Sequence, residues 1–133
     1  MNILIIEKYK LYQECLIELI SSNFDTNIIA YDSDAMGAEY IQNELTNGGH
    51  IDIVFLNVTV DDILSSAPLL LANRYKKAIN PNMSIIVFSM EMKCELINDA
   101  LEIGYIDYFI TKSISKKELV NIISLIQNPK GIK

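Results

Sequence analysis

Apolar residues along this chain fall into five short runs that are separated by longer stretches with helical periodicity. The runs span residues 3–6, 27–31, 51–56, 84–88 and 108–110. They are rich in Ile, Val and Phe and show little alternation with polar residues. This pattern is typical of strands that are buried on both faces, as in a parallel sheet covered by helices. We therefore predict five buried strands.

The stretches between and after the runs predict five helices, because apolar residues recur there every three or four positions. In chain order, the apolar positions are Leu11, Cys15, Leu19 and Ile20; Ala38, Ile41 and Leu45; Leu64, Ala67, Leu71 and Tyr75; Leu96, Ile97, Ala100 and Leu101; and Leu119, Ile122, Ile123 and Ile126.

Capping residues mark the ends of these helices. Ser33 or Asp34 is placed to cap the second helix, and Asp61 or Asp62 the third. Gly104 suits the end of the fourth helix, where a left-handed residue is common. The fifth helix opens with the capping-box pattern Ser115-Lys116-Lys117-Glu118 and ends at Pro129.

Strands that alternate with helices require right-handed crossovers and a parallel sheet. We therefore predict an α/β fold, a doubly wound (βα)5 domain with a five-stranded parallel sheet. A chain of 133 residues is enough for one such domain. The domain should cover residues 1–127, and residues 128–133 are a tail or the start of a linker.

Charge and composition exclude several classes of function. The formal net charge is −6, which disfavours direct binding to nucleic acid or to an anionic membrane. Cys15, Cys94 and the single histidine, His50, lack the spacing of a zinc site, so we expect no metal and no cofactor. Reduced cysteines, and the lack of a signal peptide or a membrane-spanning segment, favour a cytoplasmic protein.

The functional crevice of an open parallel sheet lies at the carboxyl ends of its strands. The residues that follow the apolar runs are therefore the candidates for a site. They are Glu7 and Lys8 after the first run, Asn57 after the third, Ser89 and Met90 after the fourth, and Thr111, Lys112 and Ser113 after the fifth.

These segments, ILIIEK, DIVFLN, IIVFSM and DYFITKS, resemble the receiver domains of bacterial two-component response regulators. The resemblance runs from end to end and implies a flavodoxin-like sheet with the strand order 2-1-3-4-5. It also implies phosphorylation of an aspartate that follows the third strand, assisted by Mg²⁺. Such chemistry needs a carboxylate nucleophile, and the metal needs hard oxygen ligands.

The chain departs from the family pattern at the residues that carry this chemistry. Asn57 stands at the acceptor position, where a neutral carboxamide is a very poor nucleophile. Glu7 keeps the first acid of the metal-binding pair, but Lys8 reverses the charge of the second. Lys8 is placed to repel a cation, and either fills the metal position and pairs with Glu7 or points to solvent. A structural ion pair between Glu7 and Lys112 is also expected.

Other positions of the pattern are kept, shifted or altered. Ser89 matches the conserved hydroxyl, whereas Met90 replaces a small residue and is placed to lie over the pocket. The segment after Gly104 is one residue longer than the common pattern. It therefore stays open whether Lys112 or Thr111 takes the position of the family lysine. For the same reason, either Tyr108 or Phe109 is the switch aromatic, and Ser113 replaces the usual proline.

The resemblance therefore implies a pseudo-receiver, which is not an enzyme and signals through protein contacts. Its partner, or a second copy, would bind the face formed by the fourth helix, fifth strand and fifth helix, with Tyr105, Tyr108 and Phe109 as interface residues. One alternative is a phosphorylatable regulator with a distorted pocket or a substitute acid such as Asp61 or Asp62. Another is a flavodoxin-like cofactor binder, which the segment 7–10, without a glycine-rich loop, disfavours.

Overall fold

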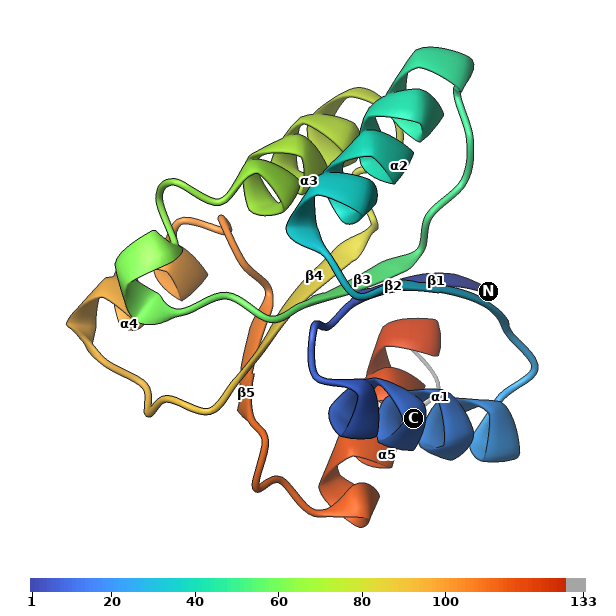
Figure 1. Ribbon diagram of the computed structural model, residues 1–133, viewed down its shortest axis with the longest axis vertical. Coiled ribbons are helices and arrows are strands. Elements are labelled where there is room, and N and C mark those ends of the chain that lie inside the picture. Colours follow the sequence, from blue (N-terminus) through green and yellow to red (C-terminus); the bar gives the residue numbers. More distant parts are fainter. Residues whose placement is uncertain (129–133) are drawn as a thin grey trace.

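The five apolar runs form one parallel sheet with the order β2-β1-β3-β4-β5, as predicted. The structure is a computed structural model, and it describes residues 1–128. Each crossover in Figure 1 carries a helix from one strand to the next. The strands are β1 (Asn2–Ile6), β2 (Asn27–Tyr31), β3 (Ile53–Leu56), β4 (Ser84–Ser89) and β5 (Tyr108–Thr111).

Helices cover both faces of the sheet, so the chain forms three layers. Figure 1 shows α2 and α3 on one face and α1 and α5 on the other, with α4 set to one side near β5. The helices are α1 (Lys10–Asn23), α2 (Asp34–Asn47), α3 (Ala67–Ala78), α4 (Glu95–Glu102) and α5 (Lys116–Gln127), and a 3₁₀ turn, η1 (Val60–Asp62), precedes α3.

The hydrophobic core has two parts, one on each face of the sheet. One part joins alternate strand residues such as Leu4, Val54 and Val87 to the inner faces of α2, α3 and α4. The other joins Ile5 and Phe55 to α1 and α5. Because successive strand residues point to opposite faces, the three central strands are buried almost throughout, which explains their unbroken apolar runs.

The first helix packs Leu19 and Ile20 in the core as predicted, but the first half of its predicted apolar face is wrong. Leu11 is 70% exposed and Cys15 is also exposed, so neither belongs to the core. The buried residues of α1 are Gln13, Leu16 and Ile20. Gln13 is buried because its side-chain amide donates to the backbone carbonyl of Glu7 at 3.2 Å. This polar contact fixes the helix rotation in a way that an apolar pattern does not reveal.

The start of the third helix also differs from the prediction. Asp61 and Asp62 do not cap it; they lie in η1 and are exposed. The N-cap of α3 is Ser66, whose hydroxyl accepts from the N–H of Leu69 at 3.2 Å. Pro68 fits the first turn because the N–H that it lacks has no partner inside a helix. The other predicted caps, Ser33, Ser115 and Gly104, are confirmed.

Pro129 and most of the expected tail lie outside the described residues. Within residues 1–128, no helix is both long enough and apolar enough to cross a membrane.

A buried tyrosine on α3 anchors the loop that leads into β3. The Tyr75 hydroxyl donates to the carbonyl of Gly49 and accepts from the N–H of Ile51 at 2.8 Å. Ile51 is therefore held by this side chain, and the strand begins at Ile53 instead of at residue 51. Burial raises the pKa of the Tyr75 phenol above its ordinary value near 10.

We predict that Tyr75→Phe lowers the free energy of unfolding by about 1–3 kcal/mol, because it leaves a buried N–H and a carbonyl without their partner. Urea denaturation followed by circular dichroism measures this loss. Tyr31→Phe is the matched control, because no hydrogen bond joins the Tyr31 hydroxyl to another described residue. An equal effect of the two variants would contradict the anchoring role.

Candidate functional site

Three strands bring Glu7, Asn57 and Lys112 to the same edge of the sheet. The sheet hydrogen bonds continue past the strand ends into these residues. The N–H of Glu7 donates to Tyr31, that of Asn57 to Ile6 and that of Lys112 to Ser89, over 2.8–3.1 Å. The backbone of the site is thus as fixed as the sheet itself.

Glu7 and Lys112 form a buried ion pair at the centre of this edge. The Glu7 Oε1 and Lys112 Nζ atoms are 2.7 Å apart, and the two side chains are only 1% and 2% exposed. The contact is an ion pair whose geometry is not that of a directed hydrogen bond. Burying two charges costs several kcal/mol for each ion, and only close pairing offsets that cost. The expected structural pair is therefore confirmed, and Lys112, not Thr111, reaches the site.

The other oxygen of Glu7 is held by two N–H groups. Glu7 Oε2 accepts from the side-chain amide of Asn57 and from the backbone N–H of Tyr9, each at 2.9 Å. Tyr9 is the N-cap residue of α1, so the carboxylate also faces the positive end of that helix. An aspartate in place of Asn57 has no hydrogen to donate when ionised, and its oxygen would face the Glu7 carboxylate directly.

Three aromatic rings lie close to the Lys112 ammonium group. The ring centroids of Tyr12, Tyr9 and Phe88 lie 4.3, 4.9 and 5.5 Å from Lys112 Nζ. Cation–π attraction stabilises a lysine whose remaining hydrogens have no acceptor among the described residues. The contact of these rings with Lys112 was not predicted from the sequence. Its one signal there is the spacing of Tyr9 and Tyr12 by three residues, which places them on one side of α1.

Lys8 does not pair with Glu7. Its side chain is exposed, and its ammonium lies 5.9 Å from the ring centroid of Tyr9. The hypothesis that Lys8 pairs with Glu7 is wrong, because Lys112 holds that carboxylate. Lys8 instead lines a cavity of about 300 Å³ beside Asn57, together with Asp34 and Asp62. Lys8 therefore adds a positive charge to the lining of this cavity.

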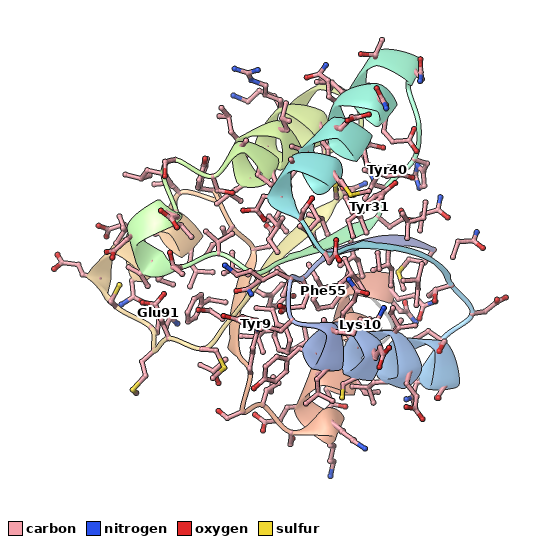
Figure 2. All side chains as sticks on the ribbon, viewed as in Figure 1. Tyr9, Lys10, Tyr31, Tyr40, Phe55 and Glu91 are labelled. Carbon is pink, nitrogen blue, oxygen red and sulfur yellow. The ribbon has the colours of Figure 1, made fainter. Side chains whose placement is uncertain are left out.

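The last residue of β4 and the loop that follows it connect to η1 through hydrogen bonds. Ser89 is 2% exposed, and its hydroxyl accepts from the N–H of Glu91 at 3.0 Å. The Glu91 carboxylate in turn accepts from the N–H of Val60 at 2.7 Å, which links the β4–α4 loop to η1 (Figure 2). This link through Glu91 was not predicted from the sequence. Its only signal was an acid two residues after the strand-end hydroxyl.

Met90 does not cover Asn57, which corrects the prediction that it lies over the pocket. It is 66% exposed and turns toward α1, where its sulfur is 3.5 Å from the Tyr12 hydroxyl. Ser113 also makes a local contact, because its hydroxyl lies 3.0 Å from that of Thr111.

The sheet separates Tyr108 from the other two proposed interface aromatics, Tyr105 and Phe109. Tyr108 packs against the core part beneath α1 and α5, whereas Phe109 packs on the side of α3 and α4. Both are half-buried. Tyr105 lies before β5 and lines a groove beside α3, and burial raises its pKa above the ordinary value near 10. They do not form one continuous aromatic patch.

The residues at this edge do not fit a magnesium site. Of the three carboxylates that the family pattern implies, only Glu7 is present, and both of its oxygens are engaged by Lys112, Asn57 and Tyr9. Asp61 and Asp62 are exposed in η1, where the Asp62 carboxylate accepts from the Thr59 hydroxyl at 2.9 Å. Between residues 1 and 128, no three acidic, histidine or cysteine side chains are grouped as metal ligands.

We predict that Lys112→Met lowers the free energy of unfolding by about 3–5 kcal/mol, because it leaves the Glu7 charge buried without a counter-ion. The double variant Glu7→Gln with Lys112→Met should be more stable than Lys112→Met alone, since no lone charge remains. Chemical denaturation of these two variants and of Glu7→Gln alone measures this coupling. Lys116→Met, at an exposed position on α5, is the control and should change stability by less than about 0.5 kcal/mol. Additive single-variant effects would show that the pair is not coupled.

No protein-family model matches this chain, and no curated protein matches its sequence. Solved structures do match. The response regulatory domain of protein mrkE from Klebsiella pneumoniae is 20% identical, with 97% of each chain covered and a TM-score of 0.74. A response regulator from Thermotoga maritima is 16% identical, with 94% of this chain and 95% of that chain covered and a TM-score of 0.69.

A CheY-like response regulator receiver domain protein from Methanospirillum hungatei JF-1 is 15% identical, with 92% of this chain and 90% of that chain covered and a TM-score of 0.69. These matches extend over nearly the whole length of each chain, and the strand order agrees with the predicted one. The chain therefore has the fold of response-regulator receiver domains.

Proposed function

We propose that this chain is a degenerate receiver domain that takes part in two-component signalling in the cytoplasm through protein contacts, without aspartyl phosphorylation and without enzymatic activity. The fold supports the first part of the proposal, because the matched structures include response regulators from several organisms. The chemistry of the strand-end residues supports the second part.

One observation carries the proposal: the Asn57 side-chain amide donates to Glu7 at 2.9 Å. This contact uses the N–H group that distinguishes asparagine from aspartate. The amide therefore stabilises the site, because it donates a hydrogen bond to the Glu7 carboxylate, which is almost fully buried. A site built around this donor has no nucleophile at the floor of the crevice.

Formation of an acyl phosphate requires an ionised carboxylate and a cation that offsets the charge of the incoming phosphoryl group. The Asn57 carboxamide is neutral and does not attack phosphorus. Lys112 is already paired with Glu7 and lies against aromatic rings. Lys8 supplies no oxygen ligand. The local charges are thus balanced without Mg²⁺ or phosphate.

Signal transfer would then depend on a surface of constant shape. We propose that a protein partner binds the face formed by α4, β5 and α5. This face offers the exposed apolar residue Leu125 and the half-buried ring of Tyr108. Control would come from binding, not from a covalent change at the strand ends.

Incubation with acetyl phosphate and Mg²⁺ should leave the intact mass unchanged, because no acceptor carboxylate stands at position 57. Mass spectrometry under conditions that preserve acyl phosphates provides the measurement. A gain of about 80 Da, the mass of one phosphoryl group, would end the proposal. If such a gain mapped to Asp61 or Asp62, a substitute acceptor would be the correct interpretation.

The variant Asn57→Asp should not be phosphorylated on its own, because Lys8 still contributes a charge and no metal ligand. The double variant Asn57→Asp with Lys8→Asp should gain measurable phosphorylation, since it restores three carboxylates to the crevice. The same mass measurement with acetyl phosphate compares the two. Equal and strong labelling of the single variant would show that Lys8 does not matter.

A further inference from the structure

A groove outside the strand-end site lies between α3 and the turn that follows α4. It has a volume of about 550 Å³, and three of its lining side chains, Arg74, Lys76 and Lys77, are cationic. No acidic residue lines it. This is unusual in a chain with 17 acidic and 11 basic residues, so basic charge is concentrated at this groove.

Two of the three cations are available to a partner. Lys76 is already neutralised, because its ammonium is 2.7 Å from the Asp107 carboxylate. Arg74 and Lys77 are exposed, and neither forms an ion pair within the part of the chain that the structure describes. They are three residues apart on α3 and therefore lie on the same side of that helix.

The groove also has an apolar wall. Ile103 is 78% exposed and Leu70 is 45% exposed, and both line it. Ile103 is the C-cap residue of α4 and is followed by Gly104 with a φ of 79°, so this turn presents the isoleucine outward. The side chain of Asn73 donates to the carbonyl of Tyr105 at 2.9 Å and ties the turn to α3. The groove is thus held in shape by the fold.

The matching chemistry is present on the adjacent helix of the same chain. Glu95, Asp99 and Glu102 of α4 are exposed, and none forms an ion pair in residues 1–128. Their spacing of four and three residues places them on one face of α4. Ile103 follows directly. The segment therefore combines an acidic face with an apolar side chain, which is what the groove on α3 would accept.

We infer that a second copy of this chain occupies the groove. In this arrangement, the acidic face of α4 in one copy packs against Arg74 and Lys77 of the other, with the two Ile103 side chains near the centre. A two-fold axis repeats the contact, because a two-fold interface requires one surface that is complementary to itself. A basic helix beside an acidic helix, with an apolar side chain between them, meets this requirement.

Charge complementarity favours a second copy over other occupants. The net charge of −6 disfavours a nucleic acid, although the groove itself is basic. An acidic segment of an unrelated protein would use the same cations, but it leaves the exposed acids of α4 unpartnered. The patch is small, and contacts of limited area form weak and reversible complexes. The dimer uses no residue of the strand-end site, so its failure leaves the proposed function intact.

Sedimentation velocity over a range of protein concentrations tests the inference. The unmodified chain should show a concentration-dependent rise in sedimentation coefficient. Arg74→Glu with Lys77→Glu should weaken self-association at least tenfold, and so should Asp99→Lys with Glu102→Lys. An equimolar mixture of these two double variants should associate again, because each supplies the charge that the other has lost.

Matched controls separate the groove from overall charge. Lys116→Glu with Lys117→Glu changes the net charge by the same amount as the α3 variant but lies on α5, and Glu14→Lys with Glu18→Lys does the same for the α4 variant on α1. Both controls should associate like the unmodified chain. Ile103→Ser should weaken association without lowering the thermal midpoint, since the side chain is mostly exposed.

Three results would overturn the inference. A chain that stays monomeric at every concentration rules out the dimer, and a protein with an acidic segment then becomes the candidate occupant. Self-association that persists in both groove variants places the interface elsewhere. A mixture of the two double variants that remains monomeric, although each variant is folded, shows that α3 and α4 do not pair between copies.

Discussion

A carboxylate buried at the edge of the sheet is the constraint on which the rest of the site depends. Glu7 is 1% exposed, so its charge must be balanced within the protein. Lys112 from the end of β5 supplies the counter-charge, and Asn57 from the end of β3 supplies a hydrogen-bond donor. Aromatic rings lie against Lys112, and both side chains of the pair are almost fully shielded from water. The Glu7 carboxylate thus connects the ends of β1, β3 and β5 to the start of α1.

This balance explains why the asparagine fits its position so well. A receiver that is phosphorylated needs several carboxylates close together, and these repel one another unless a divalent cation is bound. In this chain, one acid, one base and one amide satisfy each other without any ion. We therefore propose that the crevice keeps a single state and that variable contacts occur on the outer surfaces. The groove between α3 and the α4–β5 turn is one such surface, because exposed charge and apolar area meet there.

Much of this fold is predictable from the sequence, because buried parallel strands and capped helices leave strong local patterns. The strand order, most helix caps and the meeting of Glu7, Asn57 and Lys112 follow from those patterns and from the family resemblance. The predictions that were wrong concern the directions in which side chains point. The rotation of α1 is set by the hydrogen bond of Gln13 to the backbone, and Lys8 turns outward because Lys112 holds the carboxylate from another strand. The bridge from Glu91 to Val60 joins residues 31 positions apart, and no local pattern encodes it.

The most direct measurement of the central claim is the thermal midpoint of the unmodified chain with and without millimolar Mg²⁺, at matched ionic strength. A ligand that binds only the folded state raises the midpoint by an amount that grows with the logarithm of the ratio of its concentration to its dissociation constant. With both oxygens of Glu7 engaged by Lys112, Asn57 and Tyr9, no vacant oxygen of Glu7 is left for the ion, so the two midpoints should coincide. A midpoint several degrees higher in Mg²⁺, together with chemical-shift changes at Glu7 and Asn57, would contradict the closed, ion-free site.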